Sequence, residues 1–233
     1  MPFRNALLLT LALASLPVPA ASLPRVLLVT GGHDHELSFY EMFSAEPGFT
    51  YTVNPHPKAF RANMVKQYDV AVLYDLAEVT EEADRTNLRR YLESGKGLVL
   101  LHHSIADNQE WPWWYEEVVG GLYRLKASGS QPASTYKHDV DFDVRPVGRH
   151  PILEGIAPFK IHDEVYKHMW MSPKVQVLLE ADHPLSDKAV AWVSPYPKSR
   201  VVFIQLGHGS EAHRNPAYRK LVRNAIAWAA GGK

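Results

Sequence analysis

The feature that most constrains the fold is a set of short apolar runs separated by segments of helical length. These runs are rich in Val, Leu and Ile and cover residues 25–30, 49–53, 69–74, 97–101 and 201–206. Such runs are typical of strands that are buried on both faces of a parallel sheet. Strands that alternate with helices in this order predict a parallel sheet joined by right-handed crossovers.

Helix boundaries are marked most clearly at two places. Residues 80–94 begin with Thr80 as the expected cap, are acidic in their first turn and end before a glycine. A closing helix is expected after Asn215 as cap, with Pro216 in its first turn. A further helix is expected around residues 111–119. The predicted core face of the closing helix consists of Tyr218, Leu221, Val222, Ala225, Ile226 and Ala229.

Between residues 137 and 200 the pattern changes to short alternating runs separated by Pro and Gly. The runs at 138–144, 175–179 and 189–193 predict antiparallel strands attached to the same domain. The fold class is therefore α/β, with a doubly wound, mostly parallel sheet and an antiparallel, loop-rich insertion in the second half of the chain.

The first 22 residues follow the plan of a secretory signal peptide. Arg4 supplies the positive charge, residues 6–16 are apolar, and cleavage is expected after Ala20. A membrane anchor, the alternative, requires ~20 apolar residues, whereas this run stops at Pro17. The sequence predicts an exported protein, periplasmic or secreted, in which residues 23–233 form one domain. No membrane span is expected after the leader is removed.

Charge and cysteine content exclude several classes of function. Basic and acidic residues number 25 each, so there is no net field to attract nucleic acid, and no nucleic-acid partner is expected. Cysteine is absent, which excludes disulfides, thiolate metal sites and thiol nucleophiles. Histidine, by contrast, occurs 12 times. The sequence leaves the oligomeric state open.

Histidines and carboxylates gather where the predicted strands end. The clusters are GGHDHE at 31–36, HHSIADN at 102–108 and GHGSE at 207–211, and a fourth, IHDEVYKH, lies at 161–168. Turns and helix caps explain any one of them. Three clusters after three strands favour a shared site, because ligands bind at the carboxyl ends of parallel strands. Five other histidines are assigned to structure or surface: His56, His138, His150, His183 and His213.

These clusters, together with HPILEGI at 150–156 and RVVFIQLGHG at 200–209, resemble the ThuA-like (trehalose utilisation) family. The resemblance extends from about residue 25 to the closing helix. That family is similar to the class I glutamine amidotransferase-like superfamily, which implies a flavodoxin-like core. No nucleotide cofactor is expected.

The chain departs from the amidotransferase arrangement at its decisive position. In those enzymes a cysteine follows a central strand and pairs with a distant histidine and glutamate. Here His102, His103 and Ser104 occupy that neighbourhood, while His208 and Glu211 resemble the distant pair. Thiol-dependent amidotransfer is therefore excluded, and the register of the turn remains open.

One reading of the site is a metal centre. His33, His103 and His208 are its candidate ligands, with Glu164 as a further one, and zinc is the most suitable divalent ion because it favours imidazole nitrogen. A bound ion would lower the pKa of its water to about 7. The helix-borne HExxH pattern is missing, so spacing does not decide the question.

Two metal-free readings remain beside it. In the first, His103 and His208 exchange protons with Glu164 and Asp163 as partners. In the second, Ser104 acts as nucleophile, although no G-x-S-x-G elbow surrounds it.

The substrate class is predicted from aromatic and polar residues near the clusters. Trp114 and Val118 are expected in the core, whereas an exposed tryptophan beside them would form a platform for a sugar ring. The predicted substrate contacts are His35, Asp107, Asn108, Trp111 and Tyr166.

The expected function is that of an exported enzyme that processes a small-molecule carbohydrate. The family resemblance implies a sugar or glycoside, including one oxidised at carbon three, and hydrolase, lyase or isomerase chemistry. The alternative from another class is a non-catalytic sugar-binding or scaffold module on the same fold.

Overall fold

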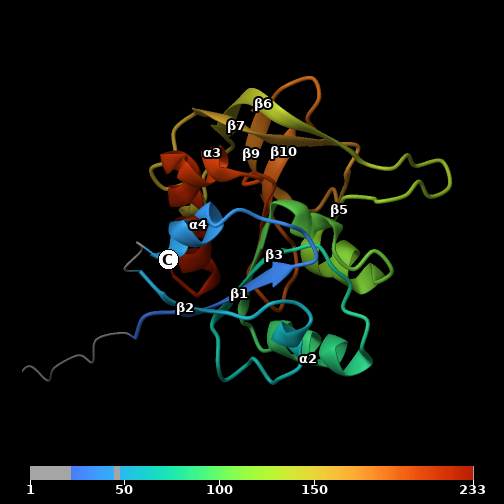
Figure 1. Cartoon of the computed structure of the whole chain (residues 1–233), viewed down its shortest axis with the longest axis vertical. Helices are drawn as coiled ribbons and strands as arrows, with labels where there is room; N and C mark the ends of the chain where they lie inside the picture. The colour runs from blue at the N-terminus through green and yellow to red at the C-terminus, as the bar shows by residue number, and fades with distance from the viewer. Residues whose placement is uncertain (1–21, 45–47, 233) are drawn as a thin grey trace, which may run out of the picture.

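The computed structural model describes residues 22–44 and 48–232 (Figure 1). The predicted leader falls outside these residues except for Ser22, so it stays a prediction. Among the helices of the described residues, none combines the length and apolar character needed to cross a membrane.

Five parallel strands form one half of a nine-stranded sheet, in the order β2-β1-β3-β4-β11. This is the flavodoxin-like order, and the predicted fold class is confirmed. The predicted apolar runs coincide with these strands within two residues. Their bounds are β1 (Arg25–Gly31), β2 (Thr50–Val53), β3 (Val70–Asp75), β4 (Gly97–Leu101) and β11 (Val201–Ile204).

The sheet continues with four antiparallel strands, in the order β10-β9-β6-β7. They lie above the parallel strands in Figure 1 and include the predicted alternating runs of the second half. Their bounds are β6 (Thr135–Pro146), β7 (Phe159–Lys167), β9 (Gln176–Asp182) and β10 (Ala189–Val193). A separate antiparallel pair joins β5 (Gly121–Leu122) to β8 (Trp170–Met171).

Helices cover both faces of the sheet, and successive strand residues point to opposite layers. Val26 and Leu28 pack in the cluster that contains α1 (Ser38–Ser44), α3 (Ser210–Arg214) and α4 (Pro216–Ala229). Leu27 and Val29 pack in the cluster that contains α2 (Glu82–Glu93) and a wide π-type helix, η3 (Trp113–Val119). Figure 1 shows α4 and α2 on opposite sides of β1 and β3. Short 3₁₀ turns are η1 (Lys58–Phe60), η2 (His102–Ala106) and η4 (Pro151–Leu153).

The two predicted helix starts fared differently. Asn215 caps α4 as expected, since its Oδ1 accepts hydrogen bonds from the amides of Ala217 and Tyr218, and all six predicted core-face residues are buried. The predicted Thr80 cap is wrong, because α2 begins at Glu82 after Glu81 and has no side-chain cap bond. The loop before α2 is held instead by Asn108, whose Oδ1 accepts from the Val79 amide at 2.7 Å.

Candidate functional site

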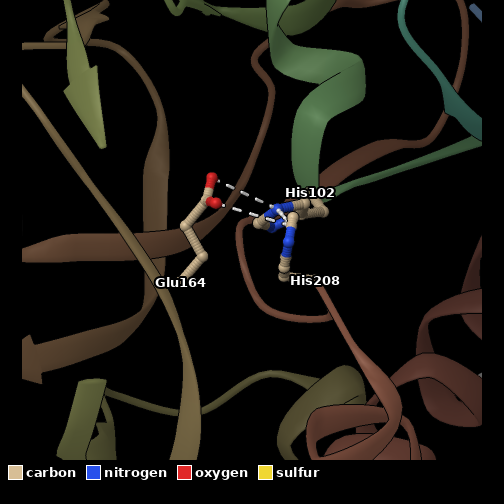
Figure 2. A group of neighbouring side chains, drawn as sticks. All are labelled: His102, Glu164 and His208. Carbon is tan, nitrogen blue, oxygen red and sulfur yellow. Dashed lines mark hydrogen bonds and ion pairs between the residues drawn. The ribbon is translucent and has the colours of Figure 1, made fainter. Parts of the chain in front are cut away.

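Three side chains from distant parts of the chain converge beyond the carboxyl end of the parallel strands. His102 follows β4, His208 follows β11, and Glu164 lies on β7. One ligand atom of each lies within 4.8 Å of the others. Figure 2 shows the carboxylate of Glu164 facing the two imidazoles. Although β7 lies at the far end of the strand order, Glu164 Oε1 lies 3.6 Å from Nε2 of His102, which follows the central strand β4.

His102 occupies the tight turn directly after β4. Its φ of 51° is in the left-handed region, which non-glycine residues adopt only where surrounding contacts enforce it. Its Nδ1 lies 2.6 Å from the carbonyl oxygen of Gln205 and must therefore donate a proton to it. The lone pair of Nε2 is thus directed toward His208 Nδ1 at 3.0 Å and the Tyr166 hydroxyl at 2.9 Å.

His208 is positioned by its own loop. Asp163 accepts hydrogen bonds from the amides of Gly207 at 2.7 Å and His208 at 2.9 Å, and the Tyr74 hydroxyl donates to the Gly207 carbonyl at 2.7 Å. Burial, followed by the charge of nearby His102, lowers the pKa of His208 to about 4. The ring is therefore neutral at physiological pH and can bind a cation.

Glu164 is presented by an irregularity in the β6–β7 pairing. Lys137 pairs with Val165 and Val140 with Asp163, so His138 and Asp139 of β6 together face Glu164 of β7. This is a β-bulge, a device that redirects side chains. It brings His138 Nδ1 to 2.5 Å from Glu164 Oε2.

The electrostatics of the site keep Glu164 ionised. Burial alone raises the pKa of its carboxyl group, but the close approach of the His102 ring, followed by the nearby rings of His208 and His138, outweighs burial and holds that pKa below its ordinary value. By contrast, burial raises the pKa of Asp163 despite the charge of His102 and three backbone amides.

The donor set formed by His102, Glu164 and His208 suits a divalent ion such as zinc. Two imidazole nitrogens and a carboxylate are ligands that zinc accepts. The bond from His102 Nδ1 to a backbone carbonyl is the outer contact that typically orients a ligating histidine. Glu164 and His208 favour the deprotonated forms that bind cations.

Two cavities adjoin this centre. The first has a volume of about 170 Å³ and its lining includes His33, His103 and Tyr166. The second has a volume of about 550 Å³ and its lining includes Asp163 and His208. Both cavities share Glu164 and His138.

The model of the ThuA family, described as trehalose utilisation, matches residues 25–229. The chain belongs to the ThuA family. Membership gives it a carbohydrate-related role in the broad sense of that description.

Solved structures agree on the fold. A ThuA-like protein from Parabacteroides merdae has a TM-score of 0.79 at 16% identity, covering 91% of each chain. Another from Bacteroides uniformis has a TM-score of 0.70 at 20% identity, covering 92% of this chain and 95% of that one. A β-galactosidase from Bacillus circulans sp. alkalophilus has a TM-score of 0.59 at 8% identity, covering 88% of this chain but 31% of that one. No curated protein matches the sequence.

Within this ThuA-family fold, the predicted metal ligands His33, His103 and His208 do lie near one another. The rings of His33 and His103 stack with centroids 4.6 Å apart, and those of His33 and His208 are 6.1 Å apart. The ligand atoms that converge, however, belong to His102, Glu164 and His208. His103 faces Tyr74 and the first cavity, and burial, aided by the charge of His102, lowers its pKa to about 2.

Four predicted substrate contacts line neither cavity. His35 Nε2 pairs with the Tyr40 hydroxyl at 2.8 Å. Asp107 and Asn108 are buried, and their Oδ1 atoms accept from the Ala77 and Val79 amides. Trp111 is buried between Trp113, Trp114 and two arginines, so it offers no sugar platform. Tyr166, the fifth, lines the first cavity.

The structure does not suit Ser104 as a nucleophile. The residue is fully buried, and its hydroxyl donates to the Leu101 carbonyl at 2.9 Å. Glu211 lines the second cavity and lies 3.3 Å from His162 Nε2, away from His102.

Sequence reasoning missed two members of the site. The His102–His103 pair after a buried strand contained the signal for His102, but only the backbone turn reveals which ring faces Glu164. His138 was assigned to structure or surface, and no pattern around it predicts the bulge that turns it toward Glu164.

A second polar cluster, which we call the sealed cluster, comprises His56, Asp75 and Asp107. His56 Nδ1 lies 2.9 Å from Asp75 Oδ2, and its Nε2 bonds to the Glu78 carbonyl. Burial raises the pKa of Asp107 well above its ordinary value, and the nearby Asp75 carboxylate adds to this. Burial lowers the pKa of His56, but the bond to Asp75 more than compensates and leaves it raised.

Proposed function

We propose that this ThuA-family protein is an exported carbohydrate-processing enzyme that acts on a sugar or glycoside. In this proposal His102, Glu164 and His208 hold a divalent ion, with zinc the expected metal. The observation that carries the proposal is the convergence of these three ligands at the wall shared by two cavities. The family description, trehalose utilisation, supports a carbohydrate as the substrate.

The ion would supply Lewis-acid polarisation of a substrate oxygen. The protein's own contribution is to orient the ligands. Gln205 fixes the tautomer of His102 through its carbonyl, and Asp163 holds the loop that carries His208. Tyr166 keeps its proton, because burial raises the pKa of its hydroxyl well above the ordinary value, so with His102 Nε2 engaged by the ion this hydroxyl is free to donate to substrate.

His138 is the group best placed to move a proton. Its Nδ1 faces the Glu164 carboxylate, which leaves Nε2 as the acceptor toward substrate. A glycoside oxidised at carbon three carries an acidic proton beside its carbonyl group. Elimination, hydration after elimination and isomerisation of such a sugar all begin with removal of that proton.

The decisive experiment incubates the purified protein with trehalose, other disaccharides and their three-keto derivatives in D₂O, with and without Zn²⁺, Mn²⁺ or Mg²⁺. Proton NMR should show deuterium entering beside the carbonyl group, and product formation. Replacing His138 by Gln should lower the rate at least ~100-fold, the contribution expected of a positioned base. Replacing His168, which lines neither cavity, by Gln serves as the control.

Metal binding is tested separately by elemental analysis of protein purified without an affinity tag. The double variant His102→Ala/His208→Ala should bind no zinc in calorimetric titration while keeping a wild-type circular dichroism spectrum. Full turnover by a metal-free preparation would contradict the proposal that the enzyme needs a bound ion. Sugar binding without any turnover would instead support a sugar-binding module.

Export is tested by expressing the whole chain and fractionating the cells. The protein should be found in the periplasm or the medium, with its N-terminus close to residue 21. Retention of the full-length chain in the cytoplasm would contradict this part of the proposal.

A further inference from the structure

The two cavities beside Glu164 are chemically unlike. The lining of the first includes the apolar and aromatic residues Ile105, Ala106, Tyr123 and Tyr136. Its volume of about 170 Å³ is below the ~300 Å³ from which pockets for drug-sized ligands usually start. The first cavity therefore suits one ring with an apolar face, and not a disaccharide.

His103 adds one polar feature to the first cavity. Its side chain is 6% exposed, and neither ring nitrogen has a hydrogen-bond partner of good geometry among the described residues. A buried imidazole without partners is costly, because each polar atom loses its bonds to water. A neutral imidazole offers one donor and one acceptor. A polar substituent on the bound ring would satisfy it.

The second cavity is lined mainly by charged and polar groups. Its lining includes Glu36, Asp139, His162 and Glu211, together with Gly209 and Ser210. At about 550 Å³ it is more than three times as large as the first. Such walls suit a polyhydroxylated group whose hydroxyls bond to carboxylates and imidazole, in part through water.

We propose that the substrate has two unlike halves, a single aglycone ring with an apolar face in the first cavity and a sugar in the second, joined by a bond that lies beside Glu164. This inference rests on the proposed function and narrows its substrate class to glycosides of a ring-bearing aglycone. Two identical glucose rings, as in trehalose, match this asymmetry poorly.

The test measures binding of the full chain, by calorimetry, to methyl, phenyl and 4-hydroxyphenyl glucopyranosides of both anomeric forms, and to trehalose. Phenyl glucoside should bind at least ~10-fold more tightly than methyl glucoside. The 4-hydroxyl group should add a few-fold more, and His103→Phe should remove that increment.

Variants locate the aglycone ring. Ala106→Phe should fill the first cavity and abolish the preference for phenyl over methyl glucoside. Because Ala106 is buried, a second variant at the exposed mouth, Tyr136→Ala, guards against misfolding and should reduce the preference a few-fold. Tyr51→Ala, an exposed tyrosine on β2, is its matched control. Glu211→Gln should weaken methyl and phenyl glucosides equally.

Equal affinities for methyl and phenyl glucosides would overturn the inference. So would a preference for phenyl that survives both Ala106→Phe and Tyr136→Ala. Turnover of trehalose without a preference for aryl glucosides would overturn this inference alone, whereas absence of both binding and turnover for every sugar would overturn the proposed function as well.

Discussion

The molecule contains two clusters of histidine and carboxylate near the carboxyl end of its parallel strands, and they hold protons in opposite ways. In the open cluster of His102, Glu164 and His208, the pKa values of Glu164 and His208 are both lowered. In the sealed cluster of His56, Asp75 and Asp107, those of His56 and Asp107 are both raised. The open cluster therefore favours the deprotonated forms of its side chains and borders two cavities. The sealed cluster favours the protonated forms and lies inside the fold.

The difference shows that residue type alone does not distinguish a ligand site from a structural one. Asp107 Oδ1 holds the Ala77 amide and His56 Nε2 bonds to the Glu78 carbonyl, so the sealed cluster ties the loop after β3 to the body of the domain. In the open cluster, Glu164 and His208 line a cavity and remain accessible to a ligand.

The largest expected effect is on stability, from Asp75→Ala in the sealed cluster. Asp75 is 1% exposed and pairs with His56, so its removal leaves a buried imidazole without its counter-charge. We expect the free energy of unfolding to fall by ~3 kcal/mol, as for other broken buried pairs. Urea denaturation at pH 6 measures it. A loss below ~1 kcal/mol would mean that the sealed cluster does not hold the fold together.

The next effect is on metal affinity, from Glu164→Gln in the open cluster. The amide keeps the shape but loses the charge, so zinc affinity should fall by at least ~100-fold, the upper end of what losing an outer partner costs. Unfolding without metal should change by less than ~1 kcal/mol. Glu211→Gln, in the wall of the second cavity, is the matched control and should leave zinc affinity unaltered. If Glu164→Gln and Glu211→Gln lowered zinc affinity equally, Glu164 would not be a specific ligand and the open cluster would not be a metal site.

A smaller effect concerns pH. Because the folded pKa values of Asp107 and His56 are raised, the stability that they contribute is complete below their unfolded values, ~3.9 and ~6.5, and is lost as pH rises through the folded values. Above pH 7 the buried histidines His103 and His208 are neutral in both the folded and the unfolded chain, so unfolding free energy should decline from pH 7 to pH 9. Asp107→Asn keeps the bond to Ala77 and needs no proton, so it should flatten this decline and stabilise the protein by ~1 kcal/mol at pH 9. Thermal unfolding across this range checks it, and an unchanged slope would argue against a proton held by Asp107.

The smallest effect on zinc affinity, as distinct from turnover, is expected from His138→Ala at the edge of the open cluster. This half-exposed ring touches Glu164 but is outside the converging ligand set. Loss of such a contact costs ~0.2–1 kcal/mol, which is about 1.4- to five-fold in zinc affinity. Calorimetric titration measures it. A loss as large as that of Glu164→Gln would make His138 a ligand in its own right.

Much of the fold was predictable because its signals are local. All six residues of β3 are buried, and a strand buried on both faces has a continuous apolar sequence. Asn215 and Pro216 mark the start of α4 within two positions. Thr80 was misleading because the loop before α2 is held by Asn108, 28 residues further along the chain.

The site was predictable only in outline, because its decisive contacts are not local. Strand ends predicted that imidazoles gather above the sheet, and His33, His103 and His208 do lie near one another. The sequence does not show that the turn at His102 takes a left-handed φ, or that the β6–β7 register places two residues opposite Glu164. Trp111 was misassigned because its ring lies against the guanidinium groups of Arg85 and Arg89 on α2, more than 20 residues earlier in the chain.

The position of Glu164 on β7 also means that a ligand bound at this site would connect distant strands of the sheet. β4, which leads into His102, and β11, which leads into His208, are neighbours, whereas β7 is the last strand in the order. A ligand that binds both Glu164 and His102 would therefore link the outermost strand, β7, to the middle of the sheet. Binding of such a ligand would stabilise the contact between the antiparallel half of the sheet and its parallel half.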